Sequence, residues 1–164
     1  MFDADDCFVR TPLHLAHALE DAKRYKYTLG VKLVRGAYHG QEIAQHAKRL
    51  AAAAPGVEVE ASPPVWLQKS DTDRCFDESA KALVEQVQRA RGFSIGRTTG
   101  VGLLFGTHNK QSCQHVLDCM VASGLAQKDS EGRFLVQSGV EDTICFGQLY
   151  GKSACNRNLT GELC

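Results

Sequence analysis

The strongest constraint on the fold of this chain is an apolar run, from Leu29 to Val34, that ends in a glycine-containing turn. The run has the length and the β-branched composition of a buried strand, and Gly36-Ala37-Tyr38 follows it. In α/β folds built from parallel strands, ligands bind at the carboxyl ends of the strands, where glycine lets the backbone approach a ligand closely. We therefore predict a central strand that presents functional groups at its carboxyl end.

Two cations belong to this stretch: Lys32 interrupts the apolar run, and Arg35 follows it directly. Because they are three residues apart, a regular strand would point them to opposite faces, and only one of them could easily reach a given ligand. An ordinary core strand whose two cations extend their stems along apolar surface explains the same pattern. Both interpretations stay open at this point.

Length and charge limit the classes of protein to consider. A chain of 164 residues with 43% hydrophobic content suits one globular unit. Its 19 basic and 19 acidic residues argue against binding to nucleic acid or to a membrane surface by bulk charge. No apolar run approaches the roughly 18 residues that span a bilayer. We expect no transit peptide, because the first residues, Met1 to Asp6, are acidic.

The seven cysteines are odd in number and include no C-x-x-C pair. A secreted disulfide framework or a structural zinc site needs closer, paired spacing. We expect free thiols in a reducing compartment, and no metal site.

The chain alternates segments typical of strands and helices. Before the central strand we expect a short strand within residues 2–10 and a helix from the Thr11-Pro12 cap to about Lys26. After it we expect these elements in order: a helix over 41–54, a loop over 57–68, a helix capped by Asp71 or Thr72 that ends near Arg89, a loop over 91–100, a strand over 101–106, a helix over 112–123 with Gly124 as C-cap, and a strand over 141–146. Residues 134–136 are too few to assign.

Polar clusters follow three of the expected strands: residues 35–38, 107–109 and 148–150. Parallel neighbouring strands bring such ends to one rim, as in a (β/α) barrel. His108 is either a structural histidine or a ligand-facing one. The glycines at 100, 102 and 106 do not form a dinucleotide-binding loop, because they precede a strand instead of opening a helix.

Four motifs, in order along the chain, resemble the proline dehydrogenase family: Val31 to Tyr38, Lys69-Ser70-Asp71-Thr72-Asp73, Thr107-His108-Asn109, and Phe146 to Gly151. The insert that contains Pro63-Pro64-Val65-Trp66 resembles the fungal branch of this family. The resemblance runs from about Phe2 to Gly151.

The resemblance implies an FAD-dependent enzyme on a (β/α)8 barrel that moves a hydride from the ring of L-proline to FAD. The implied product is Δ1-pyrroline-5-carboxylate, on the route of proline catabolism to glutamate. It further implies a mitochondrial location, a quinone or other respiratory-chain electron acceptor, and membrane association of the complete enzyme. Lys32 or Arg35 could stabilise the negative charge that develops on a reduced flavin.

The same resemblance assigns site residues by position. Substrate-binding positions are Tyr38 and Leu149. Cofactor-binding positions are Lys32, Val34, Gly36, Ala37, Lys69, Thr72, Thr107, His108, Asn109 and Gln148.

The sequence also departs from the family pattern. The Tyr-Leu-x-Arg-Arg-x-x-Glu-Asn motif, which binds the proline carboxylate in the family, does not occur, and Asp6 stands where the family usually carries a glutamine. A closed barrel takes about 250 residues. We therefore expect a partial (β/α)8 barrel over residues 1–151, made of middle-to-late units, and a disordered tail over 152–164.

Two hypotheses follow from these departures. The chain is a segment of an FAD-dependent proline dehydrogenase, which we expect not to oxidise proline measurably by itself because the arginine pair is missing. Alternatively, it is a non-catalytic (β/α) fragment, or an interaction module, from a decayed or truncated gene.

Overall fold

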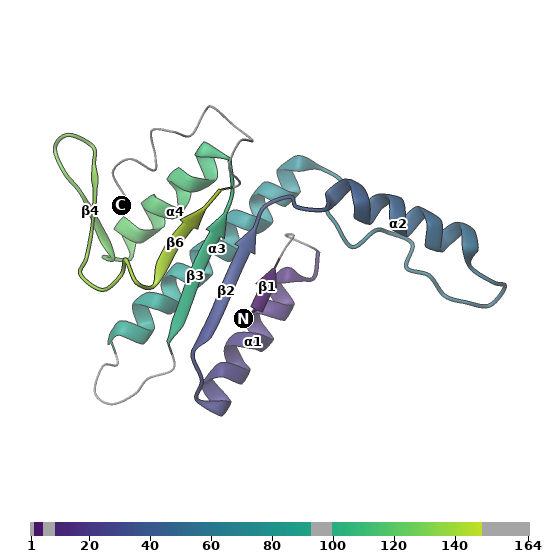
Figure 1. Ribbon diagram of the computed structural model, residues 1–164, viewed down its shortest axis with the longest axis horizontal. Coiled ribbons are helices and arrows are strands. Elements are labelled where there is room, and N and C mark those ends of the chain that lie inside the picture. The colour runs from purple at the N-terminus through teal and green to yellow at the C-terminus, as the bar shows by residue number, and fades with distance from the viewer. Residues whose placement is uncertain (1, 5–8, 93–99, 149–164) are drawn as a thin grey trace.

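The computed structural model describes residues 2–4, 9–92 and 100–148, and its centre is a sheet of four parallel strands (Figure 1). The order of the strands in the sheet is β1-β2-β3-β6. Their bounds are Phe2–Ala4 for β1, Leu29–Val34 for β2, Val101–Gly106 for β3 and Ile144–Gly147 for β6. The α/β class with parallel strands is thus confirmed. The described strands form an open sheet with β1 and β6 at its edges, so they do not by themselves make a closed barrel.

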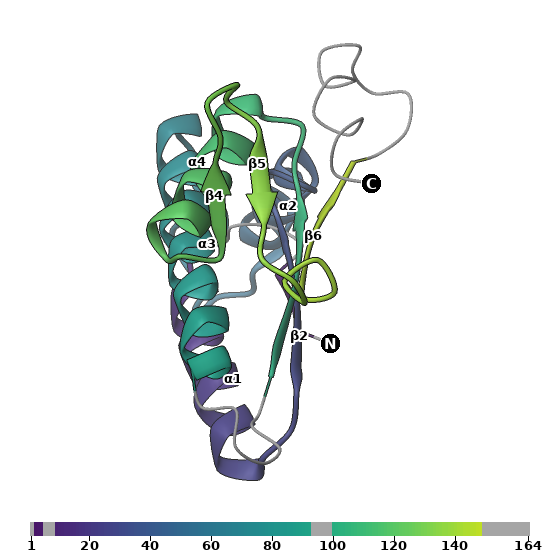
Figure 2. The same cartoon turned by 90° about the vertical axis from the view of Figure 1, so that its left-hand side faces the viewer.

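Three helices lie on one face of this sheet (Figure 2). They are α1 (Thr11–Tyr25), α3 (Lys69–Gly92) and α4 (Lys110–Ala122). A two-stranded antiparallel hairpin, β4 (Ala126–Lys128) with β5 (Phe134–Val136), follows α4. The segment 134–136, which the sequence left unassigned, is thus a strand that pairs with β4.

The hydrophobic core lies between the sheet and these helices. Alternate residues of β2 (Leu29, Val31, Leu33) and of β3 (Leu103, Phe105) are buried in it. The ring of Phe105, for example, lies 6.3 Å from that of Phe76 on α3 and 5.8 Å from that of Phe146 on β6, measured between centroids. Burial of these side chains fixes the register, because a shift by one residue would expose the whole apolar set.

The opposite face of the sheet carries more exposed residues, and three of those on β2 and β3 are glycines. On β2 these are Gly30, Lys32 and Val34, and on β3 they are Gly102, Leu104 and Gly106. No described helix covers this face (Figure 2). We call it the open face of the sheet.

The sequence assigned the N-terminal caps of α1 and α3 to the wrong residues. The residue preceding α1 is Arg10, and Thr11 is already inside the helix and 4% exposed, so Thr11 is not the cap. Helix α3 begins at Lys69, because the backbone amides of Asp71 and Thr72 both donate to the carbonyl of Gln68. Asp71 and Thr72 therefore lie within its first turn.

Helix α4 begins two residues earlier than predicted and ends at Ala122, one residue earlier than predicted, with Ser123 as its C-cap and Gly124 following it. Asn109 caps its start, since its side-chain oxygen accepts hydrogen bonds from the amides of Gln111 and Ser112. At its end, Gly124 has a φ of 72°, and the amides of Gly124 and Leu125 donate to earlier carbonyls. The left-handed residue after the helix is the reason for glycine at position 124.

Helix α2 (His39–Ala52) and the segment that follows it extend away from the sheet (Figure 1). The segment 53–68 returns beside α2, with Nε2 of His46 2.7 Å from the carbonyl oxygen of Glu60. At the start of α2, Nε2 of His39 lies 2.9 Å from the carbonyl oxygen of Trp66. The predicted helix after the central strand and the predicted loop are both confirmed. None of the described helices is both long and apolar enough to cross a membrane.

Candidate functional site

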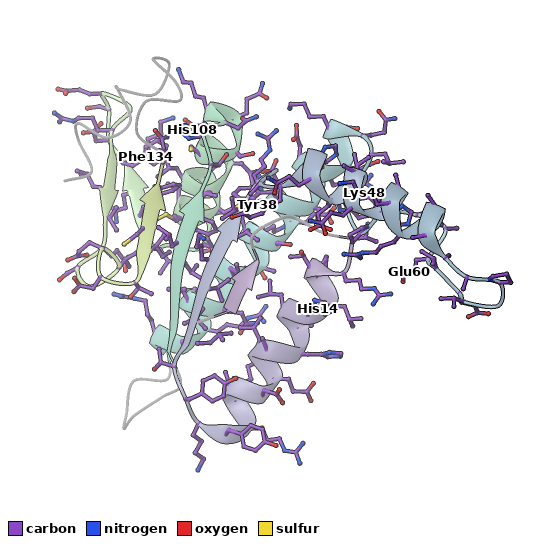
Figure 3. All side chains as sticks on the ribbon, turned by 45° about the vertical axis from the view of Figure 1, so that its right-hand side comes forward. His14, Tyr38, Lys48, Glu60, His108 and Phe134 are labelled. Atoms are coloured by element: carbon purple, nitrogen blue, oxygen red, sulfur yellow. The ribbon has the colours of Figure 1, made fainter. Side chains whose placement is uncertain are left out.

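The carboxyl ends of β2, β3 and β6 meet at one edge of the sheet. Val34 pairs with Gly106, and Gly106 pairs with Gly147, so these strands end in register. The amide of Arg35 donates to the carbonyl of Gly106 at 3.1 Å and extends the ladder by one residue. The segments 35–38 and 107–109 and the residue Gln148 therefore leave the sheet on the same side, and we call them the carboxyl edge. Figure 3 shows Tyr38 and His108 at this end of the molecule.

On the open face, the last residues of the three strands form a low surface. Val34, Gly106 and Gly147 lie side by side there. A Cβ atom at Gly106 would lie 3.1 Å from Cγ2 of Val34, and one at Gly147 would lie 3.2 Å from Cδ1 of Leu104. We call Val34, Gly106 and Gly147 the glycine floor. A flat ring can approach such a surface closely because two of its three positions have no side chain.

The turn after β2 uses two left-handed residues. Gly36 has a φ of 72° and Tyr38 has a φ of 59°. Left-handed backbone is unfavourable for an aromatic residue, so its presence at Tyr38 is a local strain of the kind found at functional positions. The Tyr38 carbonyl accepts from the Glu42 amide and starts α2, while the ring remains 56% exposed at the carboxyl edge.

Lys32 and Arg35 point to opposite faces of the sheet, as predicted from their spacing. Lys32 lies on the open face and is half-buried, in register with Leu104 of β3. Arg35 turns toward the helices, where its side chain is 11% exposed. Of the two, Lys32 is therefore the cation on the same face as the glycine floor.

Arg35 and Lys69 share one carboxylate, that of Asp73 on α3. The Nε atom of Arg35 donates to Oδ1 of Asp73 at 2.9 Å, and a second guanidinium nitrogen forms an ion pair with the same oxygen. The Nζ atom of Lys69 donates to Oδ2 at 2.6 Å. Burial acts to raise the pKa of Asp73, but the hydrogen bonds and charges of Lys69 and Arg35 outweigh it and lower that pKa. These contacts join the start of α3 to the end of β2.

Two of the predicted cofactor residues have structural contacts of their own. Thr107 is 5% exposed on the helix side of β3, and its hydroxyl oxygen accepts from the Asn109 amide at 3.0 Å. Asn109 uses its side-chain oxygen to cap α4. Between them, His108 is half-buried.

The structure places the other predicted site residues as follows. Val34, Gly36, Ala37, His108 and Gln148 lie at or beside the carboxyl edge, and Lys69 and Thr72 lie in the first turn of α3. Leu149 lies outside the described residues. The prediction missed Asp73, although the i,i+4 spacing of Lys69 and Asp73 on a helix indicated an ion pair.

Two described thiols on α4 are not activated. Burial raises the pKa of Cys113, on α4, and the charge of Arg35 offsets this only in part. Burial likewise raises the pKa of Cys119. Both groups are protonated thiols at neutral pH, which does not suit a nucleophile.

Comparisons with known proteins agree on one family. The sequence profile of the family described as proline dehydrogenase matches residues 9–157. "Proline dehydrogenase 1, mitochondrial" from Arabidopsis thaliana is 26% identical over 135 residues, which cover 82% of this chain and 23% of the plant protein. The chain thus spans about a quarter of the length of this relative.

A solved structure, the bifunctional proline utilization A (PutA) protein, shares the fold with a TM-score of 0.59. The likeness covers 92% of this chain and 11% of that protein, at 21% sequence identity. Because the family profile covers most of the sequence, the chain belongs to the proline dehydrogenase family.

Proposed function

We propose that this chain takes part in the FAD-dependent oxidation of L-proline to Δ1-pyrroline-5-carboxylate, the first step of proline catabolism to glutamate. The observation that carries the proposal is the glycine floor beside the carboxyl edge, in a chain that belongs to this family. The parallel sheet with helices on one face is further proposed to be part of a (β/α)8 barrel.

The residues present fit an FAD molecule. The glycine floor offers a ring system a surface in which two of the three positions lack a side chain, bordered by the side chains of Val34 and Leu104, and Lys32 shares its face. Lys69 and Thr72 lie at the start of α3, where a cation and helix amides favour phosphate. His108, Asn109 and Gln148 add polar groups around the same edge. When bound, FAD would supply the hydride acceptor.

The roles of the protein residues then follow from their positions. Lys32 would stabilise negative charge on the open face, because a fixed cation in a partly buried site interacts strongly with a developing anion. The ring of Tyr38, exposed at the edge, and Leu149 would form walls of the proline pocket. Gly36 and Ala37 would let the turn lie close to the cofactor.

Other parts of the proposal rest on the name of the plant relative and on the family resemblance of the sequence. The plant relative is named as mitochondrial, and we propose the same location for this chain. A quinone acceptor and membrane association of the complete enzyme are proposed with it. The fungal branch stays a prediction from the insert at 63–66.

A chimera tests this function. Residues 9–148 would replace the matched segment of the Arabidopsis relative, which supplies the rest of the protein, and proline-dependent reduction of a dye would be measured with added FAD. We expect turnover above a control without proline. A folded chimera that binds FAD and does not oxidise proline would contradict the proposal.

A further inference from the structure

One carboxylate, that of Asp73, holds cations from two different elements. Its Oδ1 atom accepts from Arg35, which follows β2, and its Oδ2 atom accepts from Lys69, the first residue of α3. Arg35 immediately precedes the turn with Gly36 and Tyr38. Asp73 therefore connects the turn after β2, which is part of the carboxyl edge, with the first turn of α3.

The two ion pairs differ in exposure. The Arg35 side chain is 11% exposed and that of Asp73 is 28% exposed, whereas the Lys69 side chain is 75% exposed. Exposed pairs contribute little to stability and exchange partners readily, while a partly buried cation left without its anion is costly. The guanidinium also holds Asp73 through two nitrogens, which fixes the geometry further. Arg35 is thus the permanent partner, and Lys69 is the exchangeable one.

We propose that Asp73 is a positioning residue that stays paired with Arg35 and keeps Lys69 at the start of α3 until a phosphate replaces Asp73 as its partner. The inference rests on the function proposed above, since the phosphate would belong to FAD. Asp73 touches neither the substrate nor the cofactor in this scheme. It sets the positions of Lys69 and of the turn that carries Tyr38.

The first test needs no ligand. The carboxyl carbon of Asp73 would be followed by NMR during a pH titration of the wild-type chain and of Lys69→Met. We expect the pKa of Asp73 to remain below its ordinary value in Lys69→Met, because Arg35 remains bound. A return to the ordinary value in this variant would overturn the assignment of Arg35 as the permanent partner.

The second test compares two variants that each remove a negative charge from the same helical turn. Asp73→Asn breaks the link to Arg35 and Lys69, whereas Asp71→Asn removes a carboxylate that pairs with Arg74. We expect the Kd for FAD to rise about tenfold in Asp73→Asn, as for the loss of a charge-assisted contact. In Asp71→Asn we expect it to stay unchanged or to fall slightly.

Equal or tighter binding of FAD by Asp73→Asn would overturn the proposal, because it would make Asp73 only a competitor for Lys69. If Asp73→Asn does not fold, the Lys69→Met titration decides whether Arg35 is the permanent partner, and FAD binding by Lys69→Met as tight as that of the wild-type chain would overturn the proposed exchange of Lys69 to a phosphate. If the folded wild-type chain does not bind FAD, the proposed function is contradicted, and the pairing of Asp73 is still judged by that titration.

Discussion

The Cβ position of Gly106 lies 3.1 Å from Cγ2 of Val34 on the neighbouring strand, so the two residues form a close-packed part of the open face. Gly102, four residues earlier on the same strand and the same face, has nothing within 4 Å of its Cβ position. A distance of 3.1 Å is shorter than ordinary packing contacts of a Cβ atom, so a methyl group at Gly106 would push Val34 aside.

This difference gives a matched pair of variants. Gly106→Ala should lower the free energy of unfolding by about 1 kcal/mol through overpacking, and it should weaken FAD binding by raising the glycine floor. Gly102→Ala should leave stability nearly unchanged. Urea unfolding and a flavin titration measure both effects. Equal behaviour of the two variants would show that Gly106 has no special role.

Tyr38 provides a second pair, because its backbone is left-handed while its ring is largely exposed. Tyr38→Gly should raise the free energy of unfolding by about 1 kcal/mol relative to Tyr38→Ala, since only glycine adopts this φ without strain. In the chimera described above, both variants should raise the KM for proline more than they reduce FAD content. An equal loss of both would place Tyr38 in the cofactor site or in the core.

Two variants of Asn109 distinguish a structural role of this residue from a role in cofactor binding. Asn109→Ala should cost about 1 kcal/mol of stability, because two amides of α4 lose their acceptor. Asn109→Asp keeps an acceptor for these amides and adds a negative charge, so it should retain stability and weaken FAD binding. Thermal unfolding and a flavin titration distinguish the two outcomes. Unchanged FAD binding by Asn109→Asp would leave the residue with the capping role alone.

The lowered pKa of Asp73 predicts a dependence of stability on pH. A carboxyl whose pKa is lower in the folded state stabilises that state above its unfolded pKa of about 3.9 and loses this contribution as the pH falls through the folded value. The difference in unfolding free energy between wild type and Asp73→Asn should therefore be constant from pH 7 to about 5 and shrink below about pH 4. Urea unfolding at several pH values measures it. A difference that does not shrink in acid would contradict the ion pairs.

The sequence predicted most of the sheet, because the apolar runs at 29–34 and 101–106 leave few alternatives to a buried strand. It placed the polar clusters 35–38 and 107–109 at strand ends correctly, since parallel neighbours bring their ends to one edge, and of the third cluster Gln148 lies within the described residues. It assigned the N-terminal caps of α1 and α3 to the wrong residues, because backbone carbonyls there replaced the side-chain caps that the pattern suggested. The hairpin at 134–136 depends on pairing with residues 126–128, which short apolar segments do not reveal.

The candidate site was predicted less completely than the sheet. Thr107 and Asn109 were assigned to the cofactor, and the structure adds that their oxygens accept hydrogen bonds from nearby amides. Asp73 was missed because its importance comes from Arg35, which is 38 residues away in sequence. Contacts between distant segments of this kind cannot be inferred from local spacing.

The most direct test of the central claim is a titration of the purified chain with FAD, followed by flavin fluorescence and checked for fold by circular dichroism. The account predicts saturable binding at a single class of sites, with weaker binding of riboflavin, which lacks the phosphates that Lys69 and Thr72 are proposed to hold. A folded chain that shows no saturable binding of FAD would contradict the account and would support a non-catalytic role instead.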